Sequence, residues 1–334
     1  PEMTRAKQKP SRTREEWEAL VGGKLLNRIG ALALIIGIGF FLKYAFDRDW
    51  ITESTRVLIG GAIGLGLLLL GARSHKRQLH VFAQGLVGAG IAILYLSVYA
   101  SFNYYHLESQ TTAFLLMSAV TMIALYQSYR YDALAIAVIG WAGGYLTPFL
   151  LSTGESNEAG LFAYLDVLEA GLLAFALLRS GWIVLELLTL AGTYSTYLLW
   201  SQQYYTEPAF LLTALFLTLF WGLFYLVDIY RTLSDQQTSR EVRRLVNILN
   251  AGIYFGFLYA IADPLHHELM GLLTLLLAGL YVLPALLTRR KDPASGMLAD
   301  HLLTVTALLV VATSIQFTGF ITVTCWAVEA VVLA

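Results

Sequence analysis

The sequence predicts an all-α, polytopic integral membrane protein with about 12 transmembrane helices and no soluble domain. Of its 334 residues, 57% are hydrophobic and only 13% are charged, which is about half of the roughly 25% charged residues in a typical soluble domain. The apolar residues recur in blocks of about 17–23, long enough to cross a hydrocarbon core as helices. Because backbone amides in lipid must be satisfied within their own segment, blocks of this length indicate helices rather than strands.

Three regions follow from the order of these blocks. Residues 1–12 are polar and basic, and we expect them to be disordered. Residues 13–24 are expected to form an amphipathic helix in the membrane interface, beginning with Thr13 and Glu16 at the spacing of a capping box. Residues 25–334 form the predicted transmembrane bundle. The last block is still apolar where the sequence ends, so we expect the bundle to be truncated at its C terminus.

Short polar connections separate the predicted spans. The spans run over residues 25–46, 54–71, 81–102, 111–128, 133–152, 159–178, 182–200, 208–230, 245–262, 269–288, 301–317 and 320–334. The longest connection, around residues 231–244, is too short for a folded domain. No soluble catalytic module is therefore expected.

The basic residues predict the orientation, because loops rich in Lys and Arg stay in the cytoplasm. Of the 22 Lys and Arg residues, 19 fall at the N terminus or in the connections that share its side. The other side has only Lys43, Arg48 and Arg56. We expect a protein of the bacterial inner membrane with a cytoplasmic N terminus. The opposite connections are rich in aromatic residues that favour the membrane boundary, namely Trp50, Tyr104, Tyr105, Trp200, Tyr204 and Tyr205.

Pairs of small residues four positions apart predict close packing between spans. The pairs are Gly60 with Gly64, Gly85 with Ala89, and Gly140 with Gly144.

A second interpretation concerns the fifth predicted span, where Gly143, Gly144, Thr147 and Pro148 lie together. Pro148 removes a helical hydrogen bond and the glycines permit bending, so these residues are a candidate helix break of the kind that lines transporter sites. A kinked helix that only packs is the alternative.

Carboxylates inside the spans are the strongest indicators of function, because a charge in hydrocarbon is costly. Asp166 and Glu169 lie three residues apart near the middle of one span, Glu186 lies in the next span, and Glu329 lies in the last. These four residues are candidates for binding a proton or a substrate. For Asp166 and Glu169 the alternative is a structural role, in which they are protonated or hydrogen-bonded and hold helices together.

One further acidic residue, Asp228, precedes Arg231 by three residues and is expected to form a local ion pair with it. No basic residue lies at the depth of Asp166 and Glu169, so a buried salt bridge is not expected for those two.

No metal or cofactor is expected. His266 and His267 lie beside Asp263 and Glu268 in a predicted outer loop, and His106 lies in another, but adjacent histidines usually point apart and do not converge on one ion. The sequence has no P-loop, no dinucleotide fingerprint and no nucleophile elbow. The expected partners are the lipid bilayer, anionic lipid for the basic N terminus, and other envelope proteins. Nucleic acid is not expected.

Three segments resemble a known family. They are Glu18–Gly30 (EALVGGKLLNRIG), Gly143–Pro148 (GGYLTP) and Trp326–Glu329 (WAVE). Their order and spacing resemble the bacterial family of large polytopic membrane proteins known as domain of unknown function 2339. The resemblance covers the chain from about Glu18 onward and implies that Asn27, Arg28, Pro148 and Glu329 belong to family motifs. It implies an almost entirely membrane-embedded fold and brings no activity or catalytic residue.

The leading functional interpretation is a transporter-like protein that translocates an envelope-related solute or lipid. In it, Asp166 and Glu169 bind protons or substrate and the Gly143–Pro148 segment forms part of the path. The alternative is a scaffold or sensor without transport, which assembles with envelope proteins and uses its carboxylates for helix–helix hydrogen bonds. An enzyme within the membrane comes third, because it needs polar residues converging from several spans and only the acidic set is evident.

Overall fold

A computed structural model describes residues 51–154, 157–179, 182–234, 239–291, 296–317 and 320–333. The chain divides into two compact units, residues 1–59 and residues 60–334. Of the first unit, only residues 51–59 are described. The predicted disordered segment, the interfacial helix and the first span at 25–46 lie outside the described residues, as do Asn27 and Arg28.

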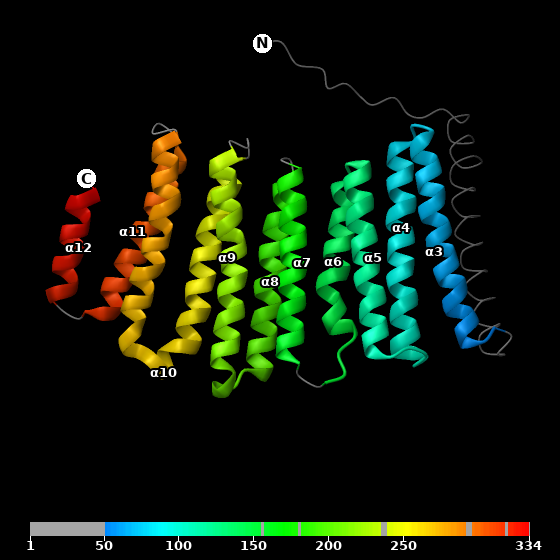
Figure 1. Ribbon diagram of the computed structural model, residues 1–334, viewed down its shortest axis with the longest axis horizontal. Helices are drawn as coiled ribbons and strands as arrows, with labels where there is room; N and C mark the ends of the chain where they lie inside the picture. The colour runs from blue at the N-terminus through cyan, green and yellow to red at the C-terminus, as the bar shows by residue number, and fades with distance from the viewer. Residues whose placement is uncertain are drawn as a thin grey trace, which may run out of the picture. The chain divides into compact units, whose positions relative to one another are not determined.

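The described residues are helical, with no strand among them. Consecutive helices of the larger unit run up and down (Figure 1). In chain order the described helices are α3 (Glu53–Lys76), α4 (His80–Tyr99) with the π-helix η2 (Ala100–Tyr104), α5 (Gln110–Tyr131), α6 (Leu134–Leu150), α7 (Glu158–Leu178), α8 (Ile183–Tyr204), the 3₁₀ helix η3 (Glu207–Ala209), α9 (Phe210–Ser234), α10 (Arg240–Lys291), α11 (Gly296–Gln316) and α12 (Phe320–Leu333).

The helix α10 is a hairpin of two arms rather than one rod. His266 has non-helical backbone angles (φ −144°, ψ 43°), and Pro264 lies two residues before it. Because proline lacks an amide hydrogen and its ring crowds the preceding turn, it favours a kink here. Figure 1 shows the two arms of α10 meeting at an angle. The arms occupy the ranges that the sequence predicts as two spans, 245–262 and 269–288.

Eight helices within the described residues are long and apolar enough to cross a membrane. The 52-residue α10 counts once among them, although its kink separates two arms. Two further apolar helices are shorter, since α6 has 17 residues and α12 has 14. The all-helical, multi-pass architecture is therefore confirmed, whereas the predicted total of 12 spans is not.

Several helices pack both on a neighbour in sequence and on the helix after the next. α4 contacts α5 and α6, α7 contacts α8 and α9, and α10 contacts α8, α9 and α11. One apolar core is formed by side chains from α3, α4, α5 and α6, among them Val87, Met117 and Ile136. A second core extends from α5 to α11 around Phe162, Leu217 and Phe220.

Large apolar side chains also cover the outer surfaces of the helices. Val81 is 85% exposed and Leu211 is 79% exposed, and many other leucines are similar. A water-soluble protein rarely leaves such extensive apolar surface uncovered. The pattern fits helices that contact lipid acyl chains.

The predicted glycine pairs have two different outcomes. A Cβ atom on Gly64 would lie 2.7 Å from Leu94 in α4, and one on Gly140 would lie 2.9 Å from Ala124 in α5, so these glycines sit at close helix contacts. By contrast, a Cβ on Gly85 would meet no atom within 4 Å. Gly85 and Ala89 lie on an exposed face of α4, and the packing prediction is wrong for this pair within the described residues.

Candidate functional site

The segment Gly143–Pro148 is not a helix break. α6 continues through Pro148 to Leu150. Proline at 148 leaves the carbonyl of Gly144 without its helical donor, and the Tyr164 hydroxyl of α7 donates to that carbonyl at 2.7 Å. Thr147 donates its own hydroxyl to the Gly143 carbonyl at 2.7 Å. The carbonyl that proline frees is thus satisfied by a neighbouring helix, as lipid requires.

The two glycines of this segment provide room for other helices rather than flexibility. A Cβ on Gly143 would collide with the ring of Tyr95 in α4. A Cβ on Gly144 would lie 2.9 Å from Leu168 in α7 and 3.4 Å from Thr121 in α5. Both positions therefore bring α6 into close contact with α4, α5 and α7.

Glu169 is fully buried within α7. Its Oε2 atom accepts a hydrogen bond from the Thr193 hydroxyl of α8 at 2.9 Å. The Tyr145 hydroxyl of α6 lies 2.7 Å from that Thr193 oxygen and also donates to the Thr189 carbonyl at 3.2 Å. Three helices thus meet at one polar line, which we call the Glu169 cluster: Tyr145, Thr189, Thr193 and Glu169.

The second carboxylate oxygen of Glu169 takes no part in the hydrogen bonds of this cluster. Glu169 Oε1 is buried and has no hydrogen-bond partner among the described residues. A buried polar atom without a partner is costly, so native proteins retain few of them. Protonation of the carboxyl, or a bound water or ligand, would remove part of this cost.

Asp166, the predicted companion of Glu169, lies one turn earlier on α7 and is only half-buried. Its Oδ1 atom is buried and also lacks a hydrogen-bond partner among the described residues. No hydrogen bond joins it to Glu169 within the described residues. The structure brings the two carboxylates onto the same part of α7 and leaves one oxygen of each unpaired.

A second polar line continues from α8 towards α9 and the arms of α10. Tyr194 donates to Asn250 Oδ1 at 2.7 Å, and the Asn250 amide donates to the Trp221 carbonyl at 3.1 Å. The Trp221 indole donates to the Tyr281 hydroxyl at 3.0 Å. The aromatic residues of this line give no signal in the sequence, because tyrosine and tryptophan also suit apolar or interfacial positions. Asn250, a polar residue within the predicted span 245–262, is the signal that could have located it.

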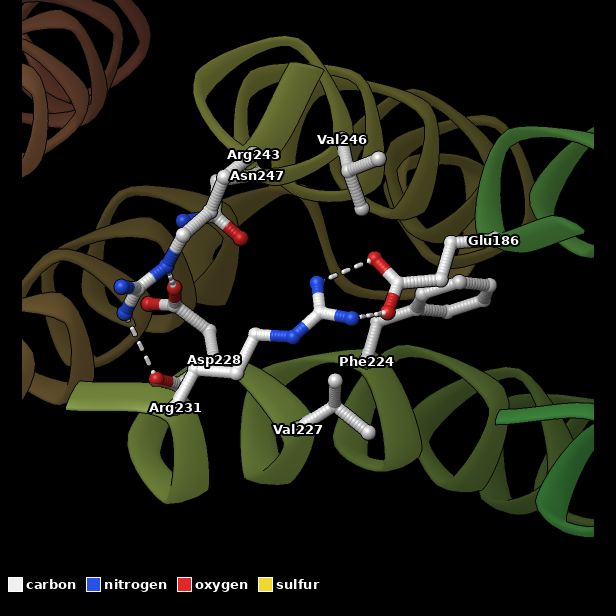
Figure 2. Close-up of a pocket in the computed structure, with 8 residues that line it drawn as sticks. All are labelled: Glu186, Phe224, Val227, Asp228, Arg231, Arg243, Val246 and Asn247. Atoms are coloured by element: carbon white, nitrogen blue, oxygen red, sulfur yellow. Dashed lines mark hydrogen bonds and ion pairs between the residues drawn. The ribbon is translucent and has the colours of Figure 1, made fainter. Parts of the chain in front are cut away.

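Glu186 belongs to a buried charge cluster at the end of the bundle where α8 begins and α9 ends (Figure 2). Arg231 of α9 is 2% exposed, and its Nη1 atom donates to Glu186 Oε2 at 2.7 Å. The Arg231 Nη2 atom forms an ion pair with Glu186 Oε1. The guanidinium therefore faces both oxygens of the carboxylate, the two-pronged geometry in which arginine binds most strongly.

Asp228 pairs with Arg243 of α10 rather than with Arg231. Arg243 Nε donates to Asp228 Oδ1 at 2.5 Å, and Arg243 Nη2 donates to the Asp228 carbonyl at 2.8 Å and to the Thr232 hydroxyl. The expected local pair of Asp228 with Arg231 is therefore wrong. Arg231 instead extends towards Glu186 on α8 (Figure 2), where it compensates a carboxylate that would otherwise be buried alone.

The charge cluster lines a partly open pocket of about 10 Å³, which is at the lower limit of the space that one water molecule needs. Glu186, Asp228, Arg231 and Arg243 line it together with four uncharged residues: Phe224, Val227, Val246 and Asn247. His301 of α11 adds a fifth ionisable group, since its Nε2 atom lies 3.8 Å from Asp228 Oδ2.

Asp300 extends the charged groups towards the surface on α11. Its carboxylate accepts hydrogen bonds from Arg240 at 2.8 and 3.1 Å, and it lies 3.8 Å from Arg244. Charges of opposite sign therefore alternate across the ends of α8, α9, α10 and α11.

The remaining predicted site residues stay apart from these clusters. Glu329 lies in α12, and the structure does not describe its side chain. His267 pairs with Asp263 at 2.6 Å within the α10 kink. Within the described residues, no group of three or more His, Cys, Asp or Glu side chains converges on a possible metal position.

The prediction that Trp200 lies at the membrane boundary is wrong. Trp200 is buried against Phe162, with ring centroids 4.7 Å apart, and does not lie on the surface of the bundle. Tyr104, by contrast, is exposed.

Comparison with known proteins places this architecture in a family. Searches of curated proteins and of solved structures find no significant match. The family model described as "Predicted membrane protein (DUF2339)" matches residues 22–334, which is most of the chain and includes both clusters. The chain belongs to this family of predicted membrane proteins, DUF2339.

Proposed function

We propose that this chain is a transporter-like protein of the bacterial inner membrane, which translocates an envelope-related solute or lipid and uses Asp166 and Glu169 to bind protons. The observation that carries the proposal is Glu169, a fully buried carboxylate with one hydrogen-bonded oxygen and one unpaired oxygen. Ionisable residues within membrane spans usually serve transport or proton transfer, because their burial is costly.

The geometry around Glu169 supports reversible proton binding. Thr193 donates a hydrogen bond to one oxygen of Glu169, whereas the other oxygen is buried without a hydrogen-bond partner among the described residues. A structural change that brings a donor or an acceptor to that second oxygen would move a proton on or off. Tyr145 and Thr193 connect the carboxyl to α6 and α8, so movement of either helix would alter its environment.

The orientation is also part of the proposal. The connections rich in Lys and Arg would lie in the cytoplasm together with the N terminus, because positive loops resist translocation. The buried charge cluster around Glu186 would then lie towards the cytoplasmic end of α8–α10.

Infrared spectroscopy of the protein in lipid vesicles tests the proton site. We expect the carbonyl band of a buried, protonated carboxylic acid, which disappears as the pH is raised. Glu169→Gln should remove this band, and Thr193→Val should shift its frequency because the carboxyl loses a donor. Glu158→Gln, at the start of the same helix, is the matched control and should leave the band unchanged. A band that persists in Glu169→Gln would contradict the assignment.

A scaffold or sensor without transport is the second candidate, and a specific observation favours it. Glu186 and Asp228 each form an ion pair with an arginine on another helix, as expected for carboxylates that only hold a bundle together. If this candidate is right, the protein should co-purify with an envelope protein in a fixed ratio. Glu169→Gln should leave the amount of that co-purified partner unchanged.

A further inference from the structure

We propose that His75 and His80, at the turn between α3 and α4, bind one divalent transition-metal ion of the zinc and copper class. The proposal is independent of the transport function. Their Nδ1 atoms lie 3.3 Å apart, and their ring centroids lie 4.7 Å apart. The two imidazoles therefore present their nitrogens to each other before any ion is bound.

A short closed turn holds the two histidines in this position. α3 ends at Lys76 and α4 begins at His80. The amide of Gln78 donates to the His75 carbonyl at 3.0 Å, and the amide of Leu79 donates to the Ser74 carbonyl at 3.1 Å. Gln78 adopts the left-handed conformation (φ 64°) that commonly ends a helix. The turn thus fixes the spacing of the two helix ends that carry the histidines.

The nitrogen spacing fits two ligands of one metal ion. Imidazole nitrogens bind Zn²⁺ at about 2.0–2.1 Å in tetrahedral geometry, which places two ligand nitrogens about 3.3 Å apart. The observed 3.3 Å matches this separation. Without a metal ion the same two nitrogens are within hydrogen-bond distance, and an ion would replace the shared proton between them.

Contacts with Gln78 and Tyr131 orient the two imidazole rings for metal binding. His80 Nε2 lies 3.1 Å from the Gln78 side-chain oxygen. A hydrogen bond from Nε2 leaves the lone pair on Nδ1, and metal-bound histidines almost always donate their second nitrogen in this way. The His75 ring lies against the buried ring of Tyr131, with centroids 4.5 Å apart.

The site offers two protein ligands, and within the described residues no third His, Cys, Asp or Glu side chain joins them. Water would complete the coordination, so the affinity should be lower than that of a closed four-ligand zinc site. Lys76 and Arg77 lie in the same turn and are exposed, and water and salt screen their repulsion of a bound cation.

Titration of the purified full chain with Zn²⁺ tests the proposal, with a purification tag that lacks histidine. Isothermal calorimetry should give one bound Zn²⁺ per chain, and this binding should be lost in both His75→Ala and His80→Ala. Gln78→Gly keeps a residue that tolerates the left-handed turn and removes the amide that orients His80. It should weaken Zn²⁺ binding by about 10-fold or more, as is found when a residue that hydrogen-bonds a metal ligand is replaced.

The control is His267→Ala, which removes a histidine paired with Asp263 elsewhere in the chain. Electron paramagnetic resonance with Cu²⁺ gives a second readout, which should show two coupled imidazole nitrogens in the wild type and one in each single histidine variant. Circular dichroism establishes that the variants keep their helices. An absence of Zn²⁺ binding in the wild type, or binding retained in both His75→Ala and His80→Ala, would overturn the proposal.

Discussion

At the scale of residues, the stability of the bundle end depends on charges that only a partner helix can compensate. Arg231 and Glu186 are almost completely buried and pair across α9 and α8. Glu186→Ala leaves the Arg231 charge buried without its partner, which should destabilise the fold by about 3–5 kcal/mol. Unfolding with SDS in mixed micelles, followed by tryptophan fluorescence, measures this loss.

Two variants separate this effect from a general loss of charge. Asp132 pairs with Arg179 at 3.5 Å on the surface, and Asp132→Asn keeps a residue suited to its left-handed backbone (φ 48°). That change should cost at most about 1 kcal/mol. The double variant Glu186→Leu with Arg231→Met replaces both buried charges and should recover most of the stability. If Glu186→Ala costs no more than Asp132→Asn, the buried pair does not carry the stability assigned to it.

The sequence allows the carboxylates to be recognised, but not their partners. Asp166, Glu169 and Glu186 stand out because acidic residues are rare in apolar spans. Arg231 pairs with a residue 45 positions away, and the nearer spacing to Asp228 suggests the wrong partner. Local spacing cannot reveal which helix face is turned towards a distant helix, so partners between helices require the packed structure.

At the scale of elements, α6 depends on glycines that admit neighbouring helices. Gly143→Ala would force a methyl group into the ring of Tyr95 and should destabilise the fold by about 1–3 kcal/mol. Gly171 is the matched control, because it lies within α7 and a Cβ there would meet no atom within 4 Å. Gly171→Ala should be neutral or stabilising by up to about 1 kcal/mol. Equal losses for both variants would contradict the packing account.

The contact between Tyr164 and Gly144 offers a second test of α6. Tyr164→Phe removes the donor for the carbonyl that Pro148 leaves free and should cost about 0.5–1.5 kcal/mol. In a Pro148→Ala background the helix supplies its own amide, so the same change should cost less. An unchanged cost in the two backgrounds would show that Tyr164 does not replace the missing helical bond.

The glycines and proline of α6 mark it as an irregular helix, but the sequence does not show whether they cause a break or a close contact between helices. Glycine and proline suggest a break, and both residue types do cause breaks in many helices. Here Tyr164, from the next helix, satisfies the free carbonyl, and Tyr95 and Leu168 fill the space over the glycines. The distinction between a break and a close contact depends on these neighbouring side chains, which a single segment does not contain.

At the scale of the whole molecule, hydropathy predicts most helix positions, because length and apolarity alone are required to cross a lipid bilayer. The helices from α3 onward lie over the predicted ranges. The number of spans does not follow in the same way, since α10 combines two predicted spans, and α6 and α12 have only 17 and 14 residues.

The proposed orientation makes a prediction for two connections. In a Cys325→Ala background, a cysteine at Glu108, between α4 and α5, should react with a membrane-impermeant thiol reagent added to spheroplasts. A cysteine at Lys76, at the end of α3, should react only after the membrane is permeabilised, because positive connections remain in the cytoplasm. The reverse pattern would contradict the orientation.

The most direct test of the central claim asks whether water reaches Glu169. In the same Cys325→Ala background, we would place a cysteine at 169 and treat membranes from each side with a membrane-impermeant thiol reagent. Leu172→Cys, three residues along α7 and equally buried in the apolar core, is the control. We expect the thiol of Glu169→Cys to react from at least one side and much faster than the thiol of Leu172→Cys. Equal protection of both positions in a correctly folded protein would mean that Glu169 is sealed within the bundle, which would contradict the transport proposal.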